Sequence, residues 1–195
     1  MRSKFALSAL TIIIATAGMA VAAEKYVIDQ THSSVEFSVK HLVITNVKGG
    51  FTDFTGSIMF DTADVSRSSV NVTIKSASIN TNDDGRDKHL RSEDFFDVEK
   101  FPEITFNSTK IEKTEKGLIA HGNLTMHGVT KNITIPFELT GPITDPWGKK
   151  RIGVEAGLTL DRKDYGIKWN KILDNGGLTV SDKVKIELNI EAIES

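Results

Sequence analysis

Alternation of apolar and polar residues is the feature of this sequence that most restricts its fold. A period of two places every second side chain on one face of a strand, whereas a helix needs a period near 3.6. Eight segments have the two-residue period, and they centre on residues 35–39, 54–60, 70–79, 104–106, 118–126, 133–139, 152–160 and 184–190. The pattern predicts an all-β protein of antiparallel strands with one buried face, with a bulge near residues 75–76 where the parity changes.

The eight strands are expected to close into a barrel, because an open sheet would leave two edges exposed to aggregation. A short turn at residues 127–130 and a longer connection over 141–148 indicate antiparallel neighbours. One segment, residues 82–96, departs from the alternation and predicts a short helix. Its apolar residues Leu90 and the Phe95-Phe96 pair are expected to face the barrel.

The N-terminal residues predict export. Arg2 and Lys4 precede an uncharged run over residues 5–18, and small residues at 20–23 precede the first acid, Glu24. This order is typical of a secretory signal peptide, and the run is shorter than the ~20 residues of a membrane-spanning helix. We therefore expect a signal peptide at 1–23, one domain at 24–195 and no transmembrane segment.

Charge and cysteine content exclude several kinds of partner and site. Loss of the signal peptide removes two of the 24 basic residues and none of the 26 acidic residues, so the net charge becomes −4. A mildly acidic surface argues against nucleic acid or an anionic membrane as the main partner. The chain has no cysteine, which excludes disulfides, thiolate metal sites and thiol nucleophiles.

Small residues at inward positions raise the question of whether the barrel is filled or hollow. The apolar parity carries Gly56, Ala120, Gly122 and Ala156, where a filled core would use larger side chains. These residues either leave room for one ligand or admit the large phenylalanines of neighbouring strands. Composition leaves both interpretations open.

The polar segment over residues 86–94 has two interpretations. It could close the barrel mouth and hydrogen-bond a ligand head group, with His89 or Arg91 as the donor. Alternatively, Asp87 caps or pairs locally and the rest is a solvated helix face, which we favour for Arg86 and Asp87.

The sequence contains neither the histidine spacing of a metal site nor the nucleophile motif of a hydrolase. The five histidines are scattered, and none of them pair at the spacing of a helical ligand motif. His32 and His127 are expected to form hydrogen bonds at strand ends, and a nucleophile motif of the Gly-x-Ser-x-Gly type does not occur. We expect no catalytic residue, no metal site and no enzymatic activity.

Six strings of the sequence resemble, in the same order, the YceI-like family of bacterial exported proteins. They are YVIDQTHSSVEFSVKH (26–41), GFTDFTG (50–56), RDKHLRSEDFFD (86–97), FPEITF (101–106), GNLTMHGVTK (122–131) and RKDYGI (162–167). The resemblance implies a periplasmic, lipocalin-like, eight-stranded barrel that holds a long polyisoprenoid, such as a quinone tail or a polyprenyl alcohol. It favours a hollow interior, and each buried methylene would contribute about 0.8 kcal/mol to binding such a chain.

The expected function is therefore to bind an amphiphilic isoprenoid or quinone-like lipid for transport or storage, with no cofactor other than that lipid. Parity predicts the ligand-binding side chains, and His89 and Arg91 are added as head-group donors. The predicted positions are Phe37, Val39, Ile58, Val72, Ile74, Phe106, Ala120, Gly122, Leu124, Ile135, Phe137, Val154, Ala156, Leu158, His89 and Arg91.

A second function remains open from the sequence. The barrel could be a scaffold for a non-enzymatic, stress-related interaction module that uses the loops at 82–100 and 144–151, because loops carry function more often than strands. Whether the chain forms a homodimer, and which barrel end opens, also stay open.

Overall fold

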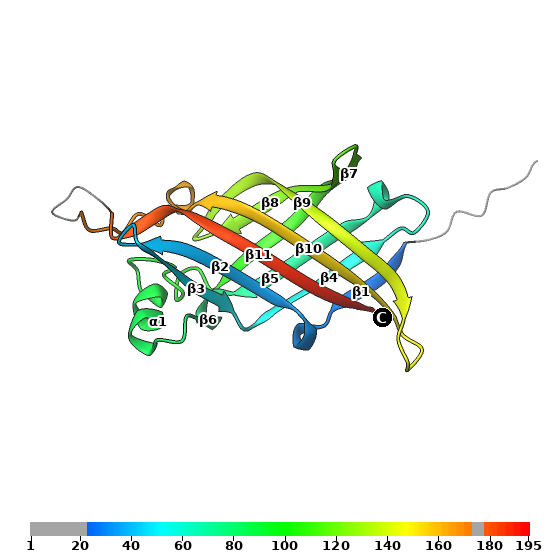
Figure 1. Cartoon of the computed structure of the whole chain (residues 1–195), viewed down its shortest axis with the longest axis horizontal. Coiled ribbons are helices and arrows are strands. Elements are labelled where there is room, and N and C mark those ends of the chain that lie inside the picture. Colours follow the sequence, from blue (N-terminus) through cyan, green and yellow to red (C-terminus); the bar gives the residue numbers. More distant parts are fainter. Residues whose placement is uncertain (1–22, 173–177) are drawn as a thin grey trace, which may run out of the picture.

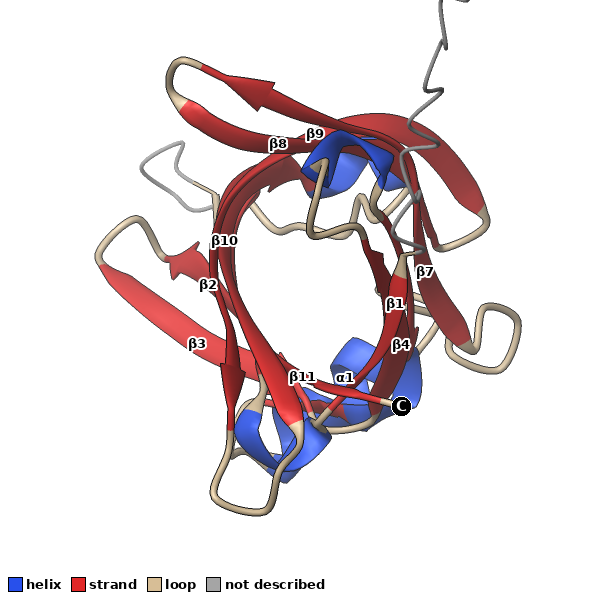
Figure 2. Cartoon of the chain, turned by 90° about the vertical axis from the view of Figure 1, so that its right-hand side faces the viewer, coloured by secondary structure: helices blue, strands red, loops and turns tan. Residues whose placement is uncertain are grey.

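The computed structural model describes residues 23–172 and 178–195 and confirms a closed, eight-stranded antiparallel barrel (Figure 1). Each ring strand pairs with the next, and β1 pairs with β11 to close the ring. In ring order the strands are β1 (Glu24–Ile28), β4 (Phe54–Phe60), β5 (Ser69–Lys75), β7 (Glu103–Thr114), β8 (Gly117–Met126), β9 (Val129–Thr144), β10 (Lys150–Asp161) and β11 (Val180–Glu194). Seen from one end, these strands surround the barrel axis (Figure 2).

Three further strands extend the sheet from β11: β2 (Ser34–His41), β3 (Thr45–Phe51) and β6 (Ile79–Asn80). The long strand β11 pairs with β1 near its C-terminal end and with β2 over its first part. The break between β1 and β2 is a 3-10 turn, Gln30–His32, where the Asp29 side chain accepts a hydrogen bond from the Thr31 amide. Residues 35–39 therefore form β2, outside the closed ring, and β1 occupies the ring position instead.

Two local predictions differ from the structure. The parity change near residues 75–76 is a 3-10 turn, Ser76–Ser78, rather than a bulge within one strand. The connection expected over 141–148 covers only residues 145–149, because β9 continues through Gly141 and Pro142 to Thr144. The β9–β10 pairing shifts its register there, between Arg151 and Gly153 of β10. The short turn between β8 and β9 is confirmed.

Helix α1 (Asp84–Arg91) confirms the short helix predicted within residues 82–96. Asp83 caps it by accepting a hydrogen bond from the Arg86 amide. Asp87 is buried and accepts hydrogen bonds from the amide and the hydroxyl of Thr81. Arg86 donates to the hydroxyl and carbonyl oxygens of Thr81 at 2.7 and 2.8 Å. The predicted structural role of Arg86 and Asp87 is thus confirmed.

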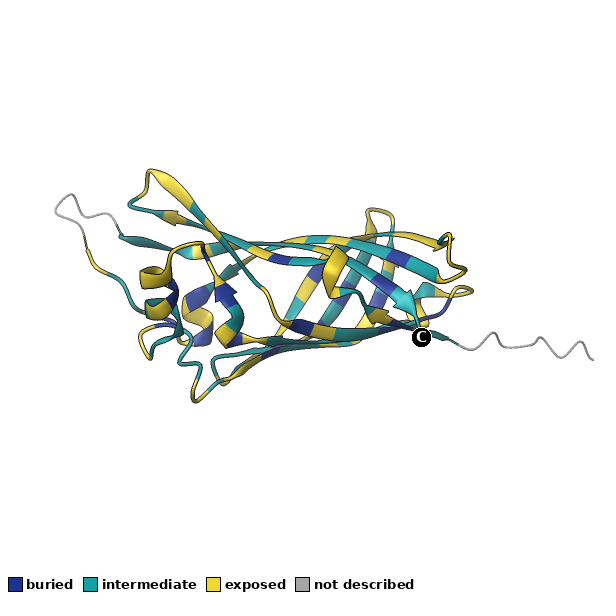
Figure 3. Cartoon of the chain, turned by 90° about the horizontal axis from the view of Figure 1, so that it is seen from below, coloured by how far each residue is buried: buried dark blue, intermediate teal, exposed yellow. Residues whose placement is uncertain are grey.

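More buried and more exposed positions alternate along parts of the strands, for example in β1 and in the middle of β8 (Figure 3). Three clusters of buried apolar side chains follow the barrel, around Tyr26, Ile104 and Ile111. Two further 3-10 turns are Val65–Arg67, between β4 and β5, and Arg162–Tyr165, after β10. Among the described residues, we find no helix that combines the length and apolar character needed to cross a membrane.

Candidate functional site

The closed ring encloses an apolar cavity of about 120 Å³, which we call the ring cavity. All eight ring strands contribute to its lining, and the only side chains in it with polar groups are Ser68 and Ser69, as far as the described residues go. The lining consists of Ile28, Ile58, Phe60, Val65, Ser68, Ser69, Val70, Val72, Phe106, Ile111, Ala120, Ile135, Phe137, Leu139, Val154, Ala156, Leu188 and Ile190. Such a lining suits an apolar guest and offers no charge to a polar one.

A second apolar cavity of about 110 Å³ lies under helix α1, and we call it the helix-end cavity. Leu90, Phe95 and Phe96 contribute to its lining, which confirms that these residues face the barrel. The complete lining is Phe37, Val39, Phe51, Ile79, Leu90, Phe95, Phe96, Met126, Leu160, Arg162, Ile167, Val180, Val184 and Ile186.

The two cavities follow one another along the barrel. On β11, Ile186 lines the helix-end cavity and Leu188 lines the ring cavity; on β10, Leu160 and Ala156 are divided in the same way. The buried residues Ile104, Leu124 and Tyr165 form a cluster that packs against Phe106 of the ring cavity and against Leu160 of the helix-end cavity, and we call this cluster the partition. Each cavity is smaller than the ~300–1,000 Å³ of most ligand sites, so a long guest must displace side chains of the partition.

Most of the binding positions predicted from parity line one of these cavities. Phe37 and Val39 line the helix-end cavity, whereas Ile74 and Leu124 belong to the partition cluster and Leu158 packs against the Ile111 cluster. The predicted positions that line the ring cavity are Ile58, Val72, Phe106, Ala120, Ile135, Phe137, Val154 and Ala156. Ligand contact by these residues stays a prediction.

The four small inward residues divide into two pairs. Ala120 and Ala156 line the ring cavity and leave space in it. The two glycines do not, because neighbouring side chains fill their space. A Cβ built on Gly122 would lie 2.5 Å from Phe106 Cζ, and one built on Gly56 would lie 2.7 Å from Ile28 Cδ1. The two glycines therefore make room for larger side chains of neighbouring strands and not for a ligand.

His89 and Arg91 lie outside the two cavity linings and are bonded to the protein. The His89 ring packs edge-on against Phe95 and Trp169, and its Nε2 lies 2.9 Å from an Asp94 carboxylate oxygen. Arg91 donates from Nε to the Ala77 carbonyl at 2.8 Å and from Nη2 to the Ile79 carbonyl. The Arg91 hydrogen bonds hold helix α1 against β6 and the 3-10 turn before it. A head-group role for either residue stays a prediction.

Arg162 is a buried cation that the sequence analysis did not identify. The residue lines the helix-end cavity, and its guanidinium donates five hydrogen bonds to the protein. The acceptors are the carbonyl oxygens of Ser181, Ile167, Trp169 and Val180 and the carboxylate of Asp182. Burial lowers the pKa of Arg162, while Asp182 and Asp161 oppose this shift. The side chain connects the segment after β10 to β11. The one sequence signal for Arg162 was its place in the family string RKDYGI.

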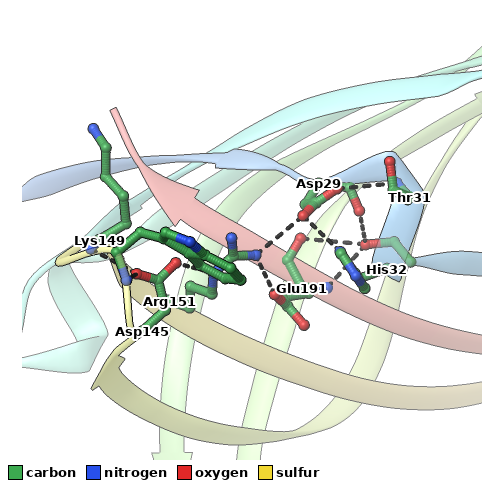
Figure 4. A network of polar contacts seen from close by, with 9 residues as sticks. Asp29, Thr31, His32, Asp145, Lys149, Arg151 and Glu191 are labelled. Carbon is green, nitrogen blue, oxygen red and sulfur yellow. Dashed lines mark hydrogen bonds and ion pairs between the residues drawn. The ribbon is translucent and has the colours of Figure 1, made fainter.

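At the other end of the barrel, Arg151 joins three carboxylates into one network (Figure 4). Its Nη1 lies 3.1 Å from Asp29 and 2.5 Å from Glu191, and its Nε lies 2.7 Å from Asp145. The hydrogen bond from Arg151 is the largest cause of the lowered pKa of Asp145, and the hydrogen bond to His32 is the largest cause for Asp29. The network connects β10 and β11 to the end of β1, where the ring closes.

Asp29, His32 and Glu191 also lie close enough together to hold a metal ion. Arg151 Nη1 already bonds to both carboxylates, however, and supplies the positive charge between them. We therefore assign this cluster to ring closure. The hydrogen bonds of His32 to Asp29 and of His127 to the Tyr165 carbonyl confirm the strand-end roles predicted for the two histidines.

Comparison with known proteins identifies the family. The model of the YceI-like domain matches residues 26–192. A UPF0312 protein of Yersinia enterocolitica is 43% identical over 182 residues, covering 92% of this chain and 91% of the relative. A UPF0312 protein of Yersinia pestis is 42% identical over 187 residues, covering 95% and 94%.

Solved structures share the fold. BcnA of Burkholderia cenocepacia superposes with a TM-score of 0.73 at 23% identity, over 84% of this chain and 98% of that protein. The YceI protein of Campylobacter jejuni gives 0.68 at 36% identity, over 80% and 90%. A polyisoprenoid binding domain of Saccharophagus degradans, implicated in plant cell wall breakdown, gives 0.65 at 17% identity, over 89% and 99%. On the match over residues 26–192 and these relatives, the chain belongs to the YceI-like family.

Proposed function

We propose that this protein binds a long apolar lipid of the isoprenoid class inside its barrel and carries or stores it. The observation that supports this most is the ring cavity, whose lining comes from all eight ring strands and is almost entirely aliphatic and aromatic. An apolar chain placed there gains about 0.8 kcal/mol for each methylene removed from water, before the costs of binding are subtracted.

The choice of an isoprenoid draws on the family. The domain of Saccharophagus degradans, which shares the fold, is described as polyisoprenoid binding. A branched prenyl chain also suits a lining of Ile, Val and Phe side chains, because it presents apolar surface along its whole length. We propose binding rather than catalysis, because the described lining of the ring cavity contains two serines but no acidic or basic side chain that could activate them.

Access for a long chain requires the partition to open. The two cavities measure only about 120 and 110 Å³, and the partition cluster of Ile104, Leu124 and Tyr165 packs against lining residues of both. Aliphatic side chains on a strand change rotamer at modest cost, so a guest that replaces their contacts can occupy both cavities. We therefore propose one chain that passes through both.

Export belongs to the same proposal. The predicted signal peptide falls on residues 1–23, of which all but Ala23 lie outside the described residues. A periplasmic barrel would allow a water-insoluble chain to leave one membrane and cross an aqueous space. Transport and storage are distinguished by whether loaded protein releases its lipid to acceptor vesicles.

The experiment is to purify the protein without detergent from a bacterial host, denature it, extract it with organic solvent and identify the extract by mass spectrometry. An isoprenoid or quinone in about one-to-one ratio with protein supports the proposal. An empty extract, also after incubation of the protein with bacterial membrane lipids, would contradict it. That result would favour the interaction module, for which Trp147, 81% exposed in the loop at 144–151, is the first contact to test.

A further inference from the structure

Tyr165 places a hydroxyl group in the barrel without giving it a partner. The residue is 1% exposed, and its hydroxyl is the buried side-chain polar atom that lacks a hydrogen bond among the residues described. Burial of an unpaired hydroxyl is unfavourable, whereas phenylalanine would fill nearly the same space without that cost. The hydroxyl therefore calls for an acceptor that the chain itself does not supply.

The backbone around Tyr165 holds the ring in place. Gly166 ends the 3-10 turn in the left-handed region at φ 77°, and the carbonyl of Tyr165 lies 3.0 Å from His127 Nδ1. Next to it, Asp164 pairs with Lys131 at 3.3 Å. The turn is thus attached to the β8–β9 hairpin, and the aromatic ring is directed into the apolar cluster rather than toward solvent.

The surroundings of Tyr165 place it between the two cavities. It shares a buried cluster with Ile104 and Leu124. Packed against this cluster are Phe106, which lines the ring cavity, and four residues that line the helix-end cavity, namely Phe51, Phe96, Met126 and Leu160. Tyr165 itself lines neither cavity, so its hydroxyl becomes accessible to a guest only when a chain that passes from one cavity to the other displaces part of this cluster.

Charge near the helix-end cavity limits the kind of acceptor. Among the residues that line the helix-end cavity, Arg162 is the cationic one. Its guanidinium donates to four backbone carbonyls and to Asp182. With five N–H groups and five acceptors, it has no donor left for a phosphate. A diphosphate would therefore be buried without a counter-charge, which is strongly unfavourable.

We propose that the Tyr165 hydroxyl donates a hydrogen bond to a neutral oxygen of the bound lipid, such as a quinone carbonyl or an alcohol oxygen. The barrel then prefers neutral oxygenated isoprenoids over plain hydrocarbons and over isoprenoid diphosphates. This inference rests on the proposed function and adds the head-group class to it. Burial, assisted by Asp164, raises the pKa of Tyr165, which keeps the hydroxyl protonated and able to donate near neutral pH.

The test compares three probes on three proteins. The probes are squalene, a benzoquinone with a polyprenyl tail of similar length, and the diphosphate of the same polyprenol. The proteins are the wild type, Tyr165→Phe and Tyr26→Phe. Tyr26 is the matched control because, like Tyr165, it is buried and lies outside both cavity linings, whereas its hydroxyl donates to Glu24 at 3.1 Å.

We expect Tyr165→Phe to weaken quinone binding about 5- to 10-fold, the usual effect of one hydrogen bond, and to leave squalene binding unchanged. Tyr26→Phe should leave the affinities for both probes unchanged. Wild-type protein should bind the quinone most tightly and the diphosphate no more tightly than squalene.

Three results would overturn the inference while the proposed function stands. They are unchanged quinone affinity in Tyr165→Phe, an equal loss for squalene and quinone in that variant, and a preference of the wild type for the diphosphate. If the wild type binds none of the probes, the proposed function itself fails and the inference fails with it. Because removal of an unpaired hydroxyl does not destabilise the empty barrel, Tyr165→Phe should melt no lower than wild type, which a thermal scan verifies.

Discussion

The aromatic ring of Phe106 lies in the space that a side chain on Gly122 would need. A Cβ at position 122 would come within 2.5 Å of Phe106 Cζ and within 2.6 Å of the Asn107 carbonyl oxygen. The ring could turn toward the ring cavity, which it already lines, but the backbone carbonyl belongs to the β7–β8 pairing. A side chain at this position therefore disturbs both the cavity and the sheet.

Gly122→Ala is expected to reduce the free energy of unfolding by about 1–3 kcal/mol, because overpacking against a fixed backbone is costly. Urea denaturation measures this change. Gly157→Ala is the matched control on β10, since its Cβ would meet nothing closer than the Ile186 carbonyl oxygen at 3.7 Å. Equal stability of the two variants would contradict the claim that the Phe106 ring needs the space left by a glycine at position 122.

The sequence was informative about the barrel because alternation reports directly which face of a strand is buried. It placed Ala120 and Ala156 correctly on the cavity wall. It could not separate these alanines from Gly122, because parity gives the face of a residue but not the neighbour across the strand that fills its space. That information lies in the register between β7 and β8.

Two features of the site had no periodic signal. Arg162 and Tyr165 lie in a 3-10 turn, where neither the helix nor the strand period applies. The acceptors of Arg162 include Val180 and Ser181 at the start of β11, so its burial depends on contacts distant in sequence. Similarly, the break between β1 and β2 depends on the Asp29 turn, which a short polar sequence does not distinguish from a continued strand.

Asp87→Ala is expected to destabilise the protein by about 2–3 kcal/mol. The carboxylate is buried and accepts from the Thr81 amide at 2.9 Å, so its removal leaves a buried amide without a partner. Helix α1 should then detach more readily from β6 and uncover the helix-end cavity. Urea denaturation gives the stability, and Asp84→Ala, an exposed acid in the first turn of the same helix, is the control. A loss no larger than that of the control would refute the assigned role.

Acid should weaken the closure of the ring. The pKa values of Asp145 and Asp29 are lowered in the folded protein, so these groups bind protons more readily when the chain is unfolded. Their contribution to stability is therefore complete above the ordinary aspartate pKa of about 4 and is lost as the pH falls through their lowered values.

Arg151→Met should lower the melting temperature at neutral pH and make it less dependent on pH below about 4, because the guanidinium is the largest cause of the lowered Asp145 pKa. Melting curves measured from neutral pH into this acid range follow the effect. Lys149→Met, which removes an exposed cation beside Asp145, should keep the wild-type profile. An Arg151→Met profile parallel to that of the wild type would rule out this network as the source of acid sensitivity.

The central claim, that the lipid lies inside the ring, is tested most directly by native mass spectrometry of Ala156→Phe beside Thr159→Phe. Position 156 lines the ring cavity, whereas Thr159 is exposed on the outer face of the same strand. The wild type and Thr159→Phe should each carry one isoprenoid chain, and folded Ala156→Phe should carry none, because its new ring occupies the cavity. Equal lipid occupancy in all three proteins would contradict an interior site.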